Sequence, residues 1–193
     1  MRPRHVLSAA AAALLLAACQ ASASPVGSPS SPEVATSGGP RPSVVGAPEL
    51  EATLPAEAAG ITLQPFSVSG PDFVEGDADE QFITFVGSLG ADIEDVSVAI
   101  AFGANADGTQ TASVLAFQVA GAEAQELIDA FKASAEQGLV WQPQTMGGKS
   151  VEASIPDPPA FPIPVVLYAT DDVLYFVSST DPNATQEILA FLP

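Results

Sequence analysis

Three pairs of short apolar segments, each pair joined by a few turn-forming residues, constrain the fold of this chain most strongly. In the first pair large residues alternate with small ones, as they do in strands with one bulky face. The pairs are 96–102 with 113–119, 140–145 with 149–155, and 165–169 with 173–178. Their turns contain Asp107-Gly108, Gly147-Gly148 and Thr170-Asp171-Asp172. Because strands joined by such short connections are antiparallel neighbours, the sequence predicts a sheet built from hairpins.

Three helical patterns accompany the hairpins. They cover 122–137, 77–89 with Gly90 behind it, and the residues that follow Asp181. In 122–137, Leu127 and Phe131 share an apolar face opposite the acidic residues. Acidic residues at 77–80 suit the positive end of the second helix, and Pro182 after Asp181 suits the first turn of the third.

An alternating segment at 61–69 adds a first strand, and five prolines within 156–164 predict an irregular crossing. The elements together predict that residues 51–193 form a single α+β domain. Its architecture is an antiparallel sheet of hairpins with about three helices packed on one face. A chain of this length buries roughly two-thirds of its unfolded surface, so it needs no disulfide or metal staple. The pattern leaves the strand order open.

The first residues follow the layout of a secretory signal. Arg2 and Arg4 precede the apolar run Val6–Leu16, whose eleven residues are too few to cross a membrane, since crossing takes about 20. The run ends in Leu16-Ala17-Ala18-Cys19, which resembles the lipobox of bacterial lipoproteins. In that family the cysteine is diacylated and the chain is then cut immediately before it.

The resemblance implies a signal peptide at residues 1–18 and a lipid anchor on Cys19. The membrane is then a partner through the acylated Cys19, with the domain on the extracytoplasmic side of the cell membrane. Cys19 is the only cysteine, so no disulfide involves it. Residues 19–50 are expected to be a disordered tether, because Ser, Pro and Gly dominate and no apolar face recurs. A Pro-rich ligand or glycan stalk is the alternative for this segment.

The charge of the domain narrows the choice of partners. Residues 51–193 hold 21 of the 23 acidic residues but only two basic ones, Lys132 and Lys149, a net charge of −19. Such a domain repels nucleic acid and anionic lipid surfaces, so neither is an expected partner. Solubility alone accounts for an acidic surface, while a basic partner or a divalent cation is the functional alternative.

Most catalytic chemistry is missing from the predicted mature chain. The only histidine is His5, inside the predicted signal peptide. Without imidazole or a free thiol, Ser-His-Asp and Cys-His nucleophiles, His-based metal sites and thiol redox chemistry are excluded. The segment Gly147-Gly148-Lys149-Ser150 is similar to the end of a phosphate-binding loop. It lacks the first glycine of that motif and fits a hairpin turn better. No catalytic, cofactor-binding or metal-binding residue is therefore nominated.

Two acidic loops contain oxygen ligands of the kind that calcium prefers. One cluster comprises Glu75, Asp77, Asp79 and Glu80, and the other comprises Asn105, Asp107 and Thr109. The second lacks the first ligand and the closing glutamate of an EF-hand, because Gly103 and Val114 stand at those positions. Solvated loops are the favoured interpretation of both. Asp171-Asp172 fits a turn, and the apolar loop Phe161–Pro164 would either rim a pocket or cover a sheet edge.

These observations lead to three functional hypotheses. The first is a non-enzymatic, lipid-anchored extracytoplasmic binding or protein-interaction module. The second is a carrier of an apolar ligand such as a lipid, which requires a continuous apolar cavity. The third is a carboxylate-dependent hydrolase, which requires two acids facing each other across a cleft.

Overall fold

Seven antiparallel strands form the main sheet in a computed structural model of the chain. The model describes residues 46–77, 80–135, 139–155 and 163–193, and the side chains of 75–81 are not described. The predicted signal peptide and lipid anchor, nearly all of the predicted tether, and most of the proline-rich crossing therefore lie outside the described residues. Within the described ranges, no helix is long and apolar enough to cross a membrane.

The chain order of the elements alternates hairpins with helices. The N-terminal elements are α1 (Pro48–Glu51), β1 (Glu57–Ala58), β2 (Ile61–Thr62), β3 (Gln64–Ser69), α2 (Gly70–Asp77) and α3 (Glu80–Ser88). The 3₁₀ turn η2 (Ile93–Asp95), β4 (Val96–Ala104), β5 (Thr111–Val119) and α4 (Ala124–Ser134) follow. The C-terminal elements are β6 (Trp141–Met146), β7 (Lys149–Ser154), β8 (Val165–Thr170), β9 (Val173–Ser179) and α5 (Pro182–Phe191).

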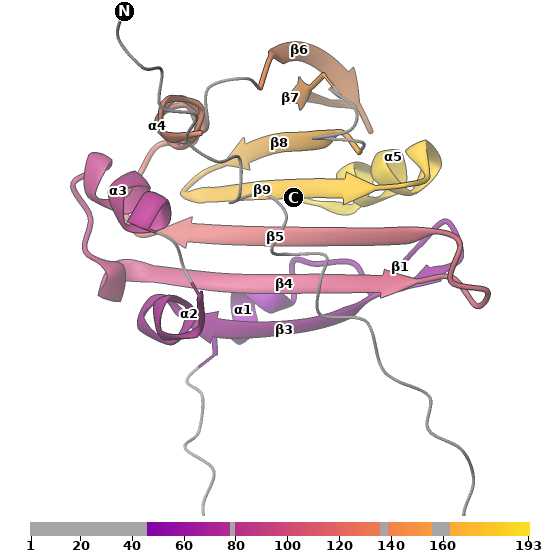
Figure 1. The fold of residues 1–193 in the computed structure, drawn as a ribbon, viewed down its shortest axis with the longest axis horizontal. Helices are drawn as coiled ribbons and strands as arrows, with labels where there is room; N and C mark the ends of the chain where they lie inside the picture. Colours follow the sequence, from indigo (N-terminus) through magenta and orange to yellow (C-terminus); the bar gives the residue numbers. More distant parts are fainter. Residues whose placement is uncertain (1–45, 78–79, 136–138, 156–162) are drawn as a thin grey trace, which may run out of the picture. The chain divides into compact units, whose positions relative to one another are not determined.

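The three predicted hairpins are confirmed as β4–β5, β6–β7 and β8–β9. The strand order is β3-β4-β5-β9-β8-β7-β6, and β1 pairs with β2 in a separate two-stranded sheet (Figure 1). Pairing of β5 with β9 joins the two halves of the sheet. The mixed α+β class and the antiparallel sheet are thus confirmed.

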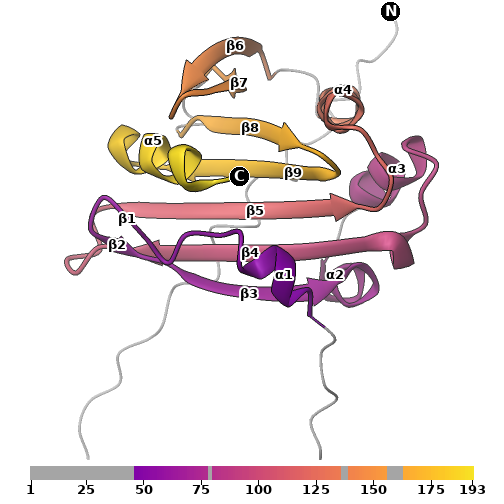
Figure 2. The ribbon, with the colours of Figure 1, turned by 180° about the vertical axis from the view of Figure 1, so that it is seen from behind.

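Helices cover both faces of the sheet, so the prediction of about three helices on one face is wrong. Apolar residues of α2, α3 and α4 pack on one face. Those of α1, β1–β2 and α5 pack on the other. Figure 1 shows the first face toward the viewer, and Figure 2 shows the second.

Small residues on the strands allow α1 and β1–β2 to pack closely on the second face of the sheet. Along β4, Val96 and Val98 face α2–α4, while Ala99 and Ala101 are fully buried beneath α1 and β1–β2. A side chain as short as alanine lets another backbone approach closely. At Gly103 the approach is closest, because a Cβ atom there would overlap the carbonyl group of Thr62.

The helix ends follow their capping chemistry where the sequence provides it. Asp181 Oδ1 accepts a hydrogen bond from Asn183 N at 2.9 Å, and Pro182 begins α5, as predicted. The pattern at 122–137 is confirmed as a helix that ends at Ser134. The predicted strand at 61–69 is instead two strands, β2 and β3, of which only β3 belongs to the main sheet.

Candidate functional site

An acidic surface hollow lies where the β8–β9 turn meets the segment before α4. It is lined by Gly121, Ala122, Glu123, Ala124, Asp171 and Asp172. Asp171 has a φ of 49°, a left-handed conformation that the tight turn requires. This confirms the interpretation of Asp171-Asp172 as a turn.

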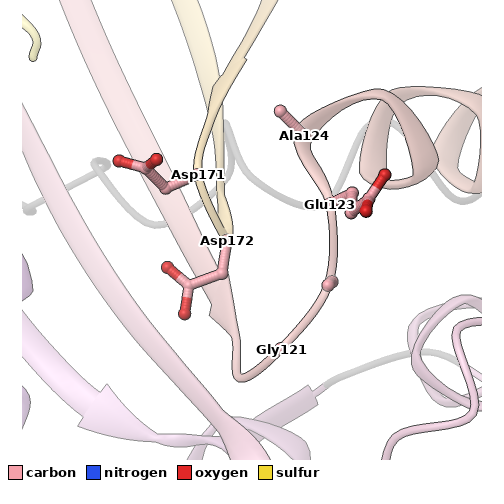
Figure 3. Close-up of a pocket in the computed structure, with 6 residues that line it drawn as sticks. Gly121, Glu123, Ala124, Asp171 and Asp172 are labelled. Carbon is pink, nitrogen blue, oxygen red and sulfur yellow. The ribbon is translucent and has the colours of Figure 1, made fainter.

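The acidic side chains of this hollow do not converge on one point. Gln118 Nε2 donates to both carboxylate oxygens of Asp172, at 3.2 and 3.3 Å. The carboxylate of Glu123 points away from the two aspartates (Figure 3). Within the described ranges, no three His, Cys, Asp or Glu side chains are placed to share a metal ion. The geometry therefore provides no facing pair of acids for hydrolysis at this hollow.

The acidic loop that contains Asn105, Asp107 and Thr109 uses its polar groups for hydrogen bonds within the loop. Asp107 Oδ1 accepts hydrogen bonds from Thr109 Oγ1 at 2.6 Å and from Thr109 N at 3.0 Å. These bonds stabilise the ionised form and hold the pKa of Asp107 below its ordinary value of 3.8. Asn105 Oδ1 accepts from Gln110 N at 3.0 Å. The loop is a hydrogen-bonded turn between β4 and β5. Of the other acidic cluster, the side chains of Glu75, Asp77 and Glu80 and the whole of Asp79 lie outside the residues that the structure describes.

A second hollow of about 310 Å³ opens beside the start of α5. Its lining is Met146, Ile163, Pro164, Val166, Ser179, Thr180, Pro182, Thr185 and Gln186. Of the loop Phe161–Pro164, Ile163 and Pro164 do rim a pocket here, while Phe161 and Pro162 lie outside the described residues. Ser179 Oγ is already engaged, because it donates to Thr111 O at 2.9 Å.

Both lysines of the domain are engaged. Lys132 Nζ lies 3.3 Å from Glu152 Oε2, although the two atoms do not form a well-aligned hydrogen bond. Lys149 Nζ donates to Pro193 O at 2.9 Å and stands 4.8 Å from the centre of the Tyr168 ring. No basic residue lies elsewhere in 51–193, so acidic groups dominate the surface of the described part.

An aromatic cluster fills the face beneath α2, α3 and α4. Its members are Phe73, Phe82, Phe85, Phe117, Phe131, Trp141 and Phe176. Phe131 and Phe176 are in edge-to-face contact, with ring centres 4.5 Å apart. This arrangement confirms that Phe131 belongs to the apolar face of the helix predicted at 122–137, and it places Phe82, Phe85 and Phe117 in the same core.

The sheet face beneath α2, α3 and α4 has no described helix over it toward the other end of the strands. Three cross-strand rows can be followed on it from the strand register. The row beneath the helices is Val68, Val98, Phe117, Leu174 and Ala169. The next row is Phe66, Ile100, Leu115, Phe176 and Leu167, and it continues to Glu152 on β7, which pairs with Lys132 of α4. The outermost row is Gln64, Phe102, Ser113, Ser178 and Val165.

On β3, β4 and β5, exposure rises from the first row toward the outermost one, whereas Leu167 on β8 is fully buried in the second row. Val98 is fully buried in the first row, Phe66 is 41 % exposed in the second, and Phe102 is 46 % exposed in the third. The rings of Phe66 and Phe102 form an edge-to-face pair with centres 6.2 Å apart. In Figure 1, α2, α3 and α4 gather over one end of this face and leave the other end without a described helix. We call the uncovered part the open face: Phe66, Ile100, Phe102, Ser113 and Leu115.

Carboxylates stand in the loops at the uncovered end of the sheet. Asp107 lies in the turn between the strands that carry Phe102 and Ser113, and Asp181 follows β9. Gln110 Nε2 donates to Asp181 Oδ2 at 3.2 Å and links the two loops. The open face is therefore uncharged, and acidic loops border it.

Sequence reasoning did not nominate the open face. Phe66 and Phe102 occupy apolar positions of alternating strands, which the pattern assigns to a core.

The chain was also compared with known proteins. No protein-family model, curated protein or solved structure matches it.

Proposed function

We propose that this chain is a lipid-anchored extracytoplasmic protein-interaction module without enzymatic activity, and that its domain binds a partner through the open face. The observation that carries the proposal is the edge-to-face pair of Phe66 and Phe102, each more than two-fifths exposed on a neutral sheet face. Exposed aromatic side chains that cluster on one surface are typical of binding sites. The lipobox-like Leu16–Cys19 supports the anchor, and the composition of 19–50 supports a tether.

The arrangement of the site favours interaction over hydrolysis. Asp171 and Asp172 lie in a turn, Glu123 points away from them, and Asp107 is engaged by Thr109. A flat apolar face offers contact area but no groups that would hold or move a proton. It suits the docking of a surface or segment of another protein.

The binding proposal is tested by photo-crosslinking in native membranes. A photoreactive amino acid is placed in the full chain at Phe102, and in a matched control at Phe191. Phe191 is 58 % exposed but belongs to α5, on the opposite face of the sheet. A discrete protein adduct is expected from position 102 and not from position 191. No adduct at 102, or equal adducts at both positions, contradicts the proposal.

The anchor is tested separately by mass spectrometry of the chain purified from its membrane. The expected N-terminal peptide begins at Cys19 and carries a diacylglyceryl group. Cys19→Ser should leave the chain in the soluble extracytoplasmic fraction, because acyl chains supply about 0.8 kcal/mol per buried methylene group. An N-terminus that is not acylated contradicts the lipid anchor and leaves the binding proposal standing.

A carrier of an apolar ligand is the second candidate, and the hollow beside α5 favours it. Its volume of about 310 Å³ is at the lower end of the usual range for ligand pockets. Met146, Ile163 and Val166 supply an apolar lining. Analysis of small molecules that co-purify with the chain tests this function. A stoichiometric lipid whose retention Gln186→Trp abolishes while thermal unfolding stays unchanged would support the carrier, because Gln186 is an exposed residue of the lining. An empty domain would contradict it.

A further inference from the structure

The negative charge of the domain around the open face limits which class of partner can bind there. Residues 51–193 carry a net charge of −19, and both of their lysines are already engaged within the domain. Lys132 pairs with Glu152, and Lys149 packs on Tyr168. A second copy of the chain would bring two such negative charges together, and an anionic membrane surface would be repelled in the same way.

The acidic loops concentrate negative charge at one end of the open face. Asp107 and Asp181 lie at the end of the sheet to which Phe102 is closest. The outermost row itself is neutral, because Gln64, Ser113 and Ser178 separate or flank its apolar members. A ligand on the open face therefore buries apolar surface in the middle and meets carboxylates at one end.

We infer that the open face binds a cationic polypeptide segment that presents apolar side chains. The inference rests on the proposed function and names the chemical class of its partner. Apolar side chains of the segment contact Phe66, Phe102 and Leu115, and its lysine or arginine side chains approach Asp107 and Asp181. Burial of the aromatic pair supplies affinity, and the charges raise the association rate and select against acidic partners.

The test uses the full chain in detergent and three synthetic peptides of about ten residues as probes. One alternates lysine with leucine, one alternates lysine with serine, and one alternates glutamate with leucine. Fluorescence anisotropy should show that the lysine–leucine peptide binds about tenfold or more tightly than either of the others. Raising NaCl from about 0.05 M to about 0.5 M should weaken it. Equal binding of the lysine–serine peptide would show attraction by charge alone and overturn the inference.

Variants locate the binding on the open face. Phe66→Ser with Phe102→Ser should lower the affinity for the lysine–leucine peptide about tenfold. Phe191→Ser, which removes a still more exposed ring from the opposite face, should not change it. Ser113→Lys is the second variant, because Ser113 is exposed and its replacement removes no packing. This added charge should abolish binding while Ser113→Gln preserves it, with thermal unfolding unchanged in both. Equal affinity in all variants overturns the inference.

The remaining outcomes separate other occupants from the proposed one. If the chain sediments as a dimer that the double Phe→Ser variant disperses, the occupant is a second copy and the inference is wrong. It is also wrong if the peptide binds only after residues 20–45 are deleted, because the chain itself then occupies the face. A protein adduct at position 102 without preference for the lysine–leucine peptide overturns the partner class alone. Absence of the adduct at position 102 overturns the proposed function, and with it the inference that rests on it.

Discussion

Tyr175 shows how one buried hydroxyl group ties two layers of the domain together. Its side chain is fully buried on β9, and its hydroxyl donates to Thr53 Oγ1 at 3.2 Å. Thr53 Oγ1 in turn donates to Leu50 O at 2.7 Å, at the end of α1. Burial raises the pKa of Tyr175 above its ordinary value of 10.0, since the phenolate loses its hydration, and the bond with Thr53 opposes this only in part.

This residue predicts a loss of stability at alkaline pH. The unfolded chain releases the phenolic proton near pH 10, whereas the folded chain keeps it to higher pH. The contribution of Tyr175 to the free energy of unfolding is therefore complete below pH 10, and it is lost as the pH rises through the folded pKa. Tyr175→Phe should cost about 1 kcal/mol at neutral pH and show a weaker alkaline decline.

Denaturant unfolding from about pH 8 to about pH 11 measures this difference. Tyr168→Phe is the control, because it leaves the Tyr175 phenol in place and should retain the wild-type decline. Parallel curves for wild type and Tyr175→Phe would show that burial of this hydroxyl does not shape the alkaline stability.

Among the elements, those with local signals were predictable. Asp107-Gly108, Gly147-Gly148 and Thr170-Asp171-Asp172 each fixed a turn, and the antiparallel pairing followed. Elements of two to four residues, such as α1 and β1, carry too little periodicity to be found. Local signals also do not show that β5 pairs with β9, because that pairing depends on tertiary packing.

The pattern does not reveal the second helical layer, because small residues on a strand are equally compatible with an outward face and with a close backbone contact. Ala99, Ala101 and Ala116 are fully buried, and their size is what allows α1 and the β1–β2 hairpin to approach. The pattern does not reveal the open face either. Strands β4 and β5 have nine residues each and extend about 30 Å, whereas a helix covers a strip about 10 Å wide. Apolar alternation alone does not show how far the covering helices reach.

Both edge strands of the main sheet contain a proline: Pro65 in β3 and Pro143 in β6. Proline has no amide hydrogen to donate, so a free edge that contains it is a poor template for another strand. Pro143 and its neighbours Gln142 and Gln144 are exposed. Pro143→Thr should therefore increase association between copies of the chain.

Analytical ultracentrifugation at about 0.5 M NaCl, where repulsion between acidic domains is screened, measures this association. The threonine variant is expected to shift to larger species as its concentration rises. Gln144→Thr adds the same residue one position along β6 without removing a proline, and it should sediment as wild type does. If the two variants behave alike, the proline does not protect this edge.

At the scale of the whole molecule, the dominant feature is charge that the fold does not neutralise. The domain folds with 21 acidic residues and two lysines, and the described structure has a single side-chain ion pair, between Lys132 and Glu152. The compact state is stabilised by the two apolar layers on the sheet and opposed by repulsion among carboxylates. Unfolding separates these charges, so salt should affect the folded state more than the unfolded one.

Thermal unfolding should therefore respond to ionic strength. Raising NaCl from about 0.02 M to about 0.5 M should stabilise the domain by about 1 kcal/mol, which raises Tm by about 3 °C for a domain of this size. Glu94→Lys, at an exposed position, should raise Tm at low salt by more than Glu94→Gln does, and the difference should shrink at high salt. Calcium chloride at matched ionic strength separates screening from binding. Because Asp107 is engaged within its own turn and the carboxylates of the acidic hollow diverge, calcium should act as sodium does, and a larger rise would reveal a coordination site. A Tm that does not change with salt would show that the acidic groups are too far apart to oppose folding.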